Sequence, residues 1–196
     1  MQKSKSIFRV ETITFTALLV ALQVVLGNIV QVPLLEKQYN LGFLPIAVAG
    51  ALLGPIPAAI VGALGDIIGS ILFPQGAYFP GFTLTNILVG LIHGFMLHKR
   101  KPNVLRVIIS VLAAGIVNML LNSYWLSILY TSKGYMGWLT VRAPSYLVEI
   151  PLQMVVVMLT LFALSRMPLP ADLRLPTGKA KTQEEPKNES AEEADS

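Results

Sequence analysis

Two rows of polar side chains interrupt apolar stretches of the sequence, and their spacing suits a binding site. Asn118, Asn122 and Trp125 follow one another at i, i+4 and i+7, on one face of a helix. The second row, at i, i+3, i+7 and i+11, is Arg142, Ser145, Glu149 and Gln153. Polar groups at lipid depth are costly and usually face the interior of a bundle. The two rows together predict a ligand pocket, although Arg142 and Glu149 would also fit a structural pair.

The segment PQGAYFPG, residues 74–81, places further candidates next to these rows. Its glycine and aromatic residues are suited to capping a pocket with aromatic faces, and they are Gly76, Tyr78, Phe79 and Pro80. The same residue types form ordinary turns. Both interpretations stay open at this point.

Asp66 is the single acidic residue in the apolar stretch 41–98. A stand-alone proton-coupled carrier would use such a buried acid, so this function is an alternative. An intramembrane aspartyl protease would need a second aspartate, and the apolar region holds none. The sequence has no phosphate loop, nucleophile elbow or catalytic carboxylate pair. We therefore expect no enzyme and no bound cofactor, and any ATP hydrolysis that drives this protein would take place on another chain.

The composition indicates that lipid is the solvent of this chain. Charged residues are 13% of the chain and hydrophobic residues 54%, whereas a soluble domain carries about 25% charged residues. There is no cysteine and there are only two histidines, His93 and His98, so we expect no metal site. The basic excess lies next to apolar segments, which fits membrane topology better than nucleic-acid binding.

Proline and glycine divide the apolar sequence into six expected helices. The stretch 41–73 would be roughly 50 Å long as one helix, and the hydrocarbon core is about 30 Å thick. We therefore split it at Gly54-Pro55-Ile56-Pro57. The expected helices are 10–32, 43–53, 57–73, 82–98, 104–130 and 138–166, joined by loops over 33–40, 74–81 and 131–137. The second is too short to span alone and should pack inside the bundle.

Two further features belong to the last part of the chain. Pro144 and Pro151 lie inside the sixth expected helix and predict a kinked or unwound outer half. After residue 167 the composition becomes polar, so residues 1–167 form the membrane domain and 168–196 a disordered cytoplasmic tail.

Basic residues set the expected orientation. They are enriched in cytoplasmic loops, and here they cluster before the first helix, after the fourth and at the end of the sixth: Lys3, Lys5, Arg9, Lys99, Arg100, Lys101, Arg106 and Arg166. The expected fold is all-α, a multi-pass protein with six transmembrane helices and both termini in the cytoplasm.

Three sequence segments resemble one family of membrane proteins. The run LGFLPIAVAGALLGPIPAAIVGALGDIIGSILFPQGAYFPGFTL (residues 41–84), the run NSYWLSILY (122–130) and the pattern Arg142-x8-Pro151-x-Gln153 are similar to the S components of energy-coupling factor (ECF) vitamin transporters. The similarity is greatest to the folate group and covers residues 9–166.

This resemblance implies a plasma-membrane protein that captures a water-soluble vitamin from outside with high affinity. Its partners would be a transmembrane coupling subunit (EcfT type) and two ATPases (EcfA type), with transport by toppling of the whole S component. The family's helix-one motif, matched here by Ala17 and Ala21, would face the coupling subunit. The family's site lies at the outer ends of helices four to six, which adds Asn86 and Tyr146 to the expected ligand-binding residues.

Ser145 departs from the folate pattern, in which a lysine commonly follows the helix-six arginine by three positions. A ligand with two carboxylates would lose one cationic partner, and Glu149 adds negative charge nearby. Folate is the expected vitamin, with pantothenate or a pyrimidine or pyridine vitamin as the alternative.

Overall fold

The computed structural model describes residues 10–34, 37–74, 76, 78–100, 103–130 and 132–167. The expected disordered tail, residues 168–196, and the basic residues before position 10 lie outside these ranges. In chain order the elements of the described residues are α1 (Val10–Asn28), β1 (Gln31–Leu34), β2 (Lys37–Asn40), α2 (Phe43–Leu52), α3 (Pro55–Leu72), α4 (Pro80–Leu97), α5 (Val104–Leu129) and α6 (Gly134–Arg166).

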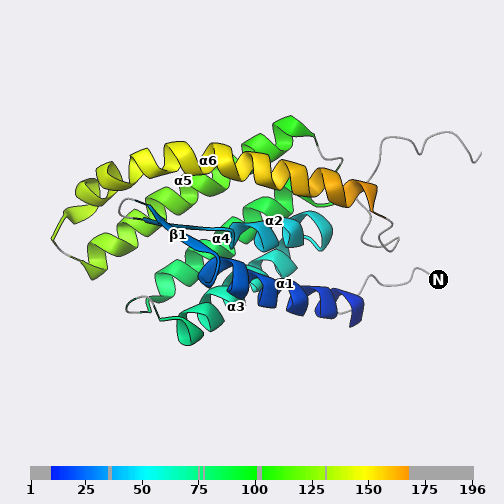
Figure 1. Ribbon diagram of the computed structural model, residues 1–196, viewed down its shortest axis with the longest axis horizontal. Coiled ribbons are helices and arrows are strands. Elements are labelled where there is room, and N and C mark those ends of the chain that lie inside the picture. The colour runs from blue at the N-terminus through cyan, green and yellow to red at the C-terminus, as the bar shows by residue number, and fades with distance from the viewer. Residues whose placement is uncertain are drawn as a thin grey trace, which may run out of the picture.

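The helices run up and down along one long axis, as the sequence predicts (Figure 1). The start of α1 and the end of α6 lie at the same end of the bundle, on the right of the view. The α3–α4 and α5–α6 connections lie at the opposite end, toward which the β1–β2 hairpin points. We call this opposite end the hairpin end.

Five of the described helices are long and apolar enough to cross a membrane, and α2, with ten residues, is not. At 1.5 Å per residue α2 is about 15 Å long, roughly half of the hydrocarbon thickness. Seven of its ten residues are buried. The short second helix therefore packs inside the bundle, as predicted.

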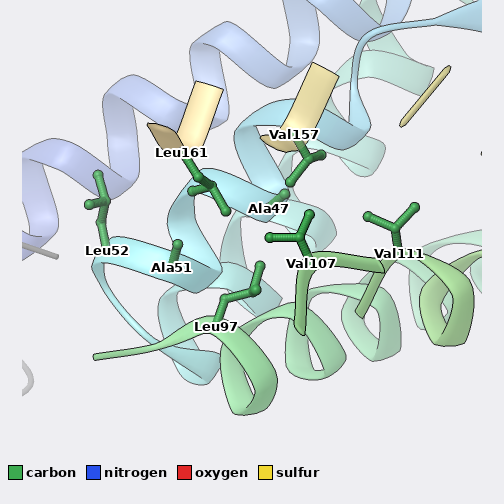
Figure 2. Packing of buried hydrophobic residues seen from close by; sticks show 8 residues of the cluster. All are labelled: Ala47, Ala51, Leu52, Leu97, Val107, Val111, Val157 and Leu161. Atoms are coloured by element: carbon green, nitrogen blue, oxygen red, sulfur yellow. The ribbon is translucent and has the colours of Figure 1, made fainter. Parts of the chain in front are cut away.

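The core around α2 is made of small and aliphatic side chains (Figure 2). From α2 come Ala47, Ala51 and Leu52, and they pack with Leu97 of α4, Val107 and Val111 of α5, and Val157 and Leu161 of α6. Small side chains on α2 let α4 and α6 approach it closely, which is how membrane helices gain packing energy.

The predicted break between the second and third helices is confirmed at Gly54. Its φ of 106° belongs to the left-handed region, which glycine adopts without the steric penalty of a Cβ atom. Pro55 then begins α3. A proline in the first turn loses no helical hydrogen bond, so α3 begins two residues earlier than predicted, and α4 likewise begins at Pro80.

The prediction of a loop over residues 33–40 is wrong. The chain forms an antiparallel hairpin, in which Gln31 pairs with Asn40 and Leu34 with Lys37. α1 also ends at Asn28 instead of continuing to position 32. Asn28 Nδ2 donates to the Val24 carbonyl at 2.9 Å and Gln31 Nε2 to the Gly27 carbonyl at 2.6 Å. These bonds satisfy carbonyls at the helix end, and the hairpin satisfies the backbone that follows.

The sixth helix is continuous through both prolines, so its outer half is not unwound; the other form of the prediction, a kink, stays a prediction. α6 also begins one turn before the predicted start, at Gly134, where φ is 60°. The Thr140 hydroxyl donates to the Met136 and Gly137 carbonyls at 3.0 Å. A proline removes the amide donor to the carbonyl four residues earlier, here the carbonyls of residues 140 and 147, so the Thr140 hydroxyl contacts different carbonyls.

Glycines bring α3 and α4 into backbone contact. A Cβ atom placed on Gly90 of α4 would lie 2.5 Å from the Ala58 carbonyl oxygen of α3. A Cβ on Gly62 of α3 would lie 2.5 Å from the Asn86 carbonyl oxygen of α4. This close approach fixes the register between the two helices, and the register places the polar residues described next.

Candidate binding site

The first predicted polar row contacts α6 at Tyr146, which lies on that helix next to Ser145 of the second row. The Asn118 side-chain oxygen accepts from Asn122 Nδ2 at 2.8 Å and from the Tyr146 hydroxyl at 2.7 Å. Tyr146 is buried, with 3% of its surface exposed, and both asparagines are half-buried. Asn118, Asn122 and Tyr146 therefore form one hydrogen-bonded group inside the bundle and do not face lipid.

Trp125, about one turn further along α5, links that helix to α4. Its indole N–H donates to the Thr85 hydroxyl at 3.1 Å, and Phe79 packs against its ring with a centroid distance of 5.6 Å. Gly81 makes room for both rings, because a Cβ atom there would lie 2.5 Å from Phe79 Cε1 and Trp125 Cδ2. Phe79 and Trp125 thus form an aromatic pair at the hairpin end.

Asp66 and Asn86 meet across the α3–α4 interface. Asp66 Oδ1 accepts from Asn86 Nδ2 at 3.0 Å, and Asp66 Oδ2 accepts from the Thr83 hydroxyl at 2.6 Å. Thr83 also bonds to the Tyr78 hydroxyl at 2.9 Å. Tyr78 and Asn86, both predicted site residues, therefore share the Asp66 carboxyl group as a common anchor.

Arg142 lies on α6 one turn before Tyr146, with its guanidinium carbon 6.0 Å from the centre of the tyrosine ring. Its Nε is buried and has no hydrogen-bond partner among the described residues. Ser145 is buried, and its main-chain carbonyl accepts from the Tyr39 hydroxyl of β2 at 3.2 Å. The hairpin therefore docks on α6 beside Arg142 and Tyr146.

The remaining predicted residues lie at the two ends of this region. Deeper along α6, Gln153 Nε2 donates to Glu149 Oε1 at 2.9 Å, and both side chains are half-buried. Gly76 is exposed in the α3–α4 connection, and a Cβ atom there would lie 3.7 Å from the Tyr130 hydroxyl. Gly76 makes none of the hydrogen bonds described above.

Three buried polar atoms of α5 and α6 are available to bind a ligand. Asn122 Oδ1, Ser123 Oγ and Arg142 Nε have no hydrogen-bond partner within the described part of the chain. Buried polar atoms are nearly always paired in folded proteins. An acceptor on Asn122 and a donor on Arg142 therefore suit a ligand that carries both donors and acceptors.

The comparisons with known proteins identify the family. The family model described as "ECF transporter, substrate-specific component" matches residues 11–161, a range that contains every predicted site residue. The chain belongs to this family. The predicted class of protein, a multi-pass membrane S component and not an enzyme, is thereby confirmed.

Curated relatives of this S component carry the name folate transporter FolT. The one from Clostridium novyi is 33% identical over 150 residues, which cover 76% of this chain and 87% of the relative. The one from Leuconostoc mesenteroides subsp. mesenteroides is 30% identical over 143 residues, with 70% and 77% covered. A crystal structure of FolT bound with folic acid superimposes with a TM-score of 0.69 at 29% identity, covering 75% of this S component and 90% of that chain.

The two alanines predicted to face the coupling subunit lie on the outside of the S component. Ala17 and Ala21 are exposed on α1, next to Leu18 and Leu22 with 62% and 42% of their surfaces exposed. Neither alanine is used to pack α1 against the bundle. Their role at a subunit interface stays a prediction.

Three residues that were not predicted link the predicted residues of this S component to one another: Thr83, Thr85 and Tyr39. A signal for the threonines was present. An aspartate at lipid depth needs polar partners, and residues 83–86, Thr-Leu-Thr-Asn, are a polar cluster in an apolar stretch soon after Asp66. No comparable signal in the sequence connects Tyr39 with residue 145.

Proposed function

We propose that this S component binds folate at the hairpin end and delivers it across the membrane together with a coupling subunit and two ATPases. The observation that supports this best is that hydrogen bonds from Trp125 and Tyr146 connect α4, α5 and α6 at this end. Next to these bonds, Asn122 Oδ1 and Arg142 Nε are buried and have no hydrogen-bond partner among the described residues. The curated FolT relatives and the FolT structure with folic acid support folate as the ligand.

The chemistry of folate matches the residue types at this end. Folate has a flat pterin ring with donors and acceptors on its edge, a benzoyl group and a glutamate with two carboxylates. The Phe79–Trp125 pair would stack against the flat benzoyl group, and Asn122 would bond to the amide next to it. The guanidinium of Arg142 would bind a carboxylate through two parallel hydrogen bonds.

The lower part of the α6 row would recognise the opposite end of the ligand from Arg142. Glu149 and Gln153 lie two and three turns further along α6, about 10 and 16 Å from Arg142 at 1.5 Å per residue. A carboxylate and an amide suit the amino and ring N–H groups of a pterin. This assignment places the pterin deep in the protein and the glutamate near the outside.

The departure at Ser145 is consistent with this orientation. Ser145 is buried against Tyr39 and has 3% of its surface exposed, so it would not contact the ligand carboxylates directly. Arg142 is then the main cationic partner of the glutamate. Pantothenate, which has one carboxylate and no flat ring, would leave the Phe79–Trp125 pair without a stacking partner.

The family assignment and the exposed surface of α1 support a proposal for the partner subunits and for the orientation in the membrane. We place Ala17 and Ala21 against the coupling subunit, both termini in the cytoplasm and the hairpin end outside. ATP would be bound and hydrolysed by the two ATPases, and no cofactor would be held by this chain. Transport would then depend on the assembled complex.

Ligand titration of the purified protein tests this function. Tryptophan fluorescence or calorimetry would be measured with folate, pantothenate, and one pyrimidine and one pyridine vitamin. We expect submicromolar binding of folate and at least hundredfold weaker binding of the others. Submicromolar binding of pantothenate without folate binding, or no submicromolar ligand at all, would contradict the proposal. The Trp138→Phe variant leaves Trp125 as the single tryptophan and assigns the signal to the site.

A further inference from the structure

Asp66 is a carboxyl group within a membrane-spanning helix, and both of its oxygens accept hydrogen bonds. Oδ2 accepts from the Thr83 hydroxyl at 2.6 Å and Oδ1 from Asn86 Nδ2 at 3.0 Å. A carboxylate accepts only, because it has no proton to donate. Charge-assisted bonds of this kind are the strong ones, so they hold α4 firmly against α3.

The bond from Thr83 to Asp66 fixes the direction of the next bond. A threonine hydroxyl has one proton, and in this arrangement it points to Asp66 Oδ2. The bond of 2.9 Å between Tyr78 and Thr83 must then have the Tyr78 hydroxyl as its donor. Tyr78, Thr83 and Asp66 form a relay that runs from the surface to the interior: Tyr78 is 48% exposed and Thr83 is 7% exposed.

The outer end of this relay adjoins the aromatic pair. Phe79 follows Tyr78 in the chain, and its ring packs against Trp125 at 5.6 Å and against Phe82 at 6.2 Å. Tyr78 is thus tied to α3 through Thr83, whereas Phe79 contacts α5. A displacement of Tyr78 would therefore carry Phe79 away from Trp125.

We infer that Asp66 is a positioning residue that, through Thr83 and Tyr78, holds the Tyr78–Phe79 segment against Trp125 and so maintains the aromatic wall of the substrate site. Only the effect on folate rests on the proposed function, because the positioning of Phe79 on Trp125 is a property of the ligand-free protein. This role differs from that of a transported-proton carrier, which would require Asp66 to release its bonds in each cycle.

The first test measures the wall without any ligand. In a Trp138→Phe background Trp125 is the only tryptophan, and quenching of its fluorescence by acrylamide reports whether Phe79 covers it. We expect Asp66→Ala and Tyr78→Phe each to raise the quenching constant about twofold or more, because both cut the relay. Tyr78→Phe leaves the Asp66 bonds to Thr83 and Asn86 in place, so it remains informative even if Asp66→Ala does not fold.

Asp66→Asn is the conservative comparison. Its amide oxygen can accept from Asn86, and its amide nitrogen can donate to Thr83, whose proton then turns to the Tyr78 oxygen. The relay survives with its direction reversed, so we expect quenching close to wild type and recovery of most of the folate affinity. Asp66→Ala should weaken folate binding about tenfold, since loss of the aromatic wall would cost up to about 1.5 kcal/mol of stacking.

Two results would overturn the inference. One is unchanged Trp125 quenching in both Asp66→Ala and Tyr78→Phe, which would leave Asp66 as a contact between α3 and α4 only. The other is a rise in the quenching constant in Asp66→Asn as large as that in Asp66→Ala, which would show that the hydrogen-bonded relay is not what holds Phe79 against Trp125. If the wild-type protein fails to bind folate, the proposed function fails, but the quenching result still decides the role of Asp66.

Discussion

Trp125 on α5 donates its indole N–H to the hydroxyl of Thr85 on α4 across 3.1 Å. The same hydroxyl donates to the Gly81 carbonyl in the preceding turn of α4 at 3.1 Å. Thr85 is completely buried, so this pair of bonds is shielded from water. The orientation of the Trp125 ring is therefore set by α4, and Phe79 packs against a ring that is already held in place.

Trp125→Ala should weaken folate binding about tenfold while the protein still folds. An aromatic pair contributes about 0.5–1.5 kcal/mol, and 1.4 kcal/mol corresponds to a factor of ten in affinity. Isothermal titration calorimetry measures the change, since the fluorescent reporter is removed. Trp125→Phe keeps a stacking ring and should lose less affinity. Equal losses in the two variants would argue against stacking.

Arg142→Ala should weaken folate binding by about 10- to 100-fold, the range expected when a hydrogen bond to a charged group of about 1.5–3 kcal/mol is removed. Arg142→Lys keeps the charge but not the planar fork, so it should recover only part of the loss. Calorimetry with folate and with pteroic acid, which lacks the glutamate, separates the roles. A similar loss for both ligands would place Arg142 near the pterin instead.

Ala17→Trp and Ala21→Trp should prevent assembly with the coupling subunit and leave folate affinity unchanged. Both alanines are exposed on α1, and a large side chain there would keep the facing helix from close approach. Co-purification with the coupling subunit and calorimetry with folate are the measurements. Leu159→Trp on α6, at a position that is 63% exposed, is the matched control. Normal co-purification of both alanine variants would disprove the interface.

Gly90→Ala should destabilise the fold by about 1–3 kcal/mol, the usual cost of inserting a methyl group into a packed core. The new Cβ would lie 2.5 Å from the Ala58 carbonyl oxygen, which is backbone and cannot rotate away. Thermal unfolding in detergent measures the effect. Gly76→Ala, whose Cβ would have its nearest neighbour at 3.7 Å, should change the unfolding temperature little. Equal unfolding temperatures for the two variants would mean that α3 and α4 can separate.

Local chemistry explains which features the sequence predicted correctly. The break at Gly54 and Pro55 follows from sterics within a few residues. The shared face of Asn118, Asn122 and Trp125 follows from helical periodicity alone. Both kinds of feature are independent of how helices dock, so they could be read without coordinates.

The features that the sequence did not reveal depend on the register between elements. Asp66 meets Thr83 and Asn86 only because Gly62 and Gly90 bring α3 and α4 into backbone contact. The Tyr39 hydroxyl reaches the Ser145 carbonyl across a separation of 106 residues. The hairpin was missed because β1 (QVPL) contains a proline and β2 (KQYN) is mostly polar, so neither shows the alternation of apolar and polar residues that is typical of a strand.

His98 should make the stability of the protein depend on pH. The residue follows the last turn of α4, and its ring lies against Gly54, with atoms 3.3–3.4 Å from a Cβ atom placed there. Burial, together with the charge of Lys99, lowers the pKa of His98 below its usual value of 6.5, against a smaller opposing effect of the Ala51 backbone. Its neutral form is therefore the one that the folded state favours.

Because the pKa is lower in the folded state, the unfolded state binds this proton more readily below pH 6.5. The contribution of neutral His98 to the free energy of unfolding should be fully present above that pH and should decrease as the solution is acidified. Unfolding temperatures of the wild type and His98→Gln, measured between about pH 5 and pH 8, isolate this residue, since His93 is common to both proteins. We expect the unfolding temperature of His98→Gln to fall less between pH 6.5 and about pH 5 than that of the wild type. If the unfolding temperatures of the two proteins changed with pH in parallel, protonation of His98 would not destabilise the folded state and this prediction would be wrong.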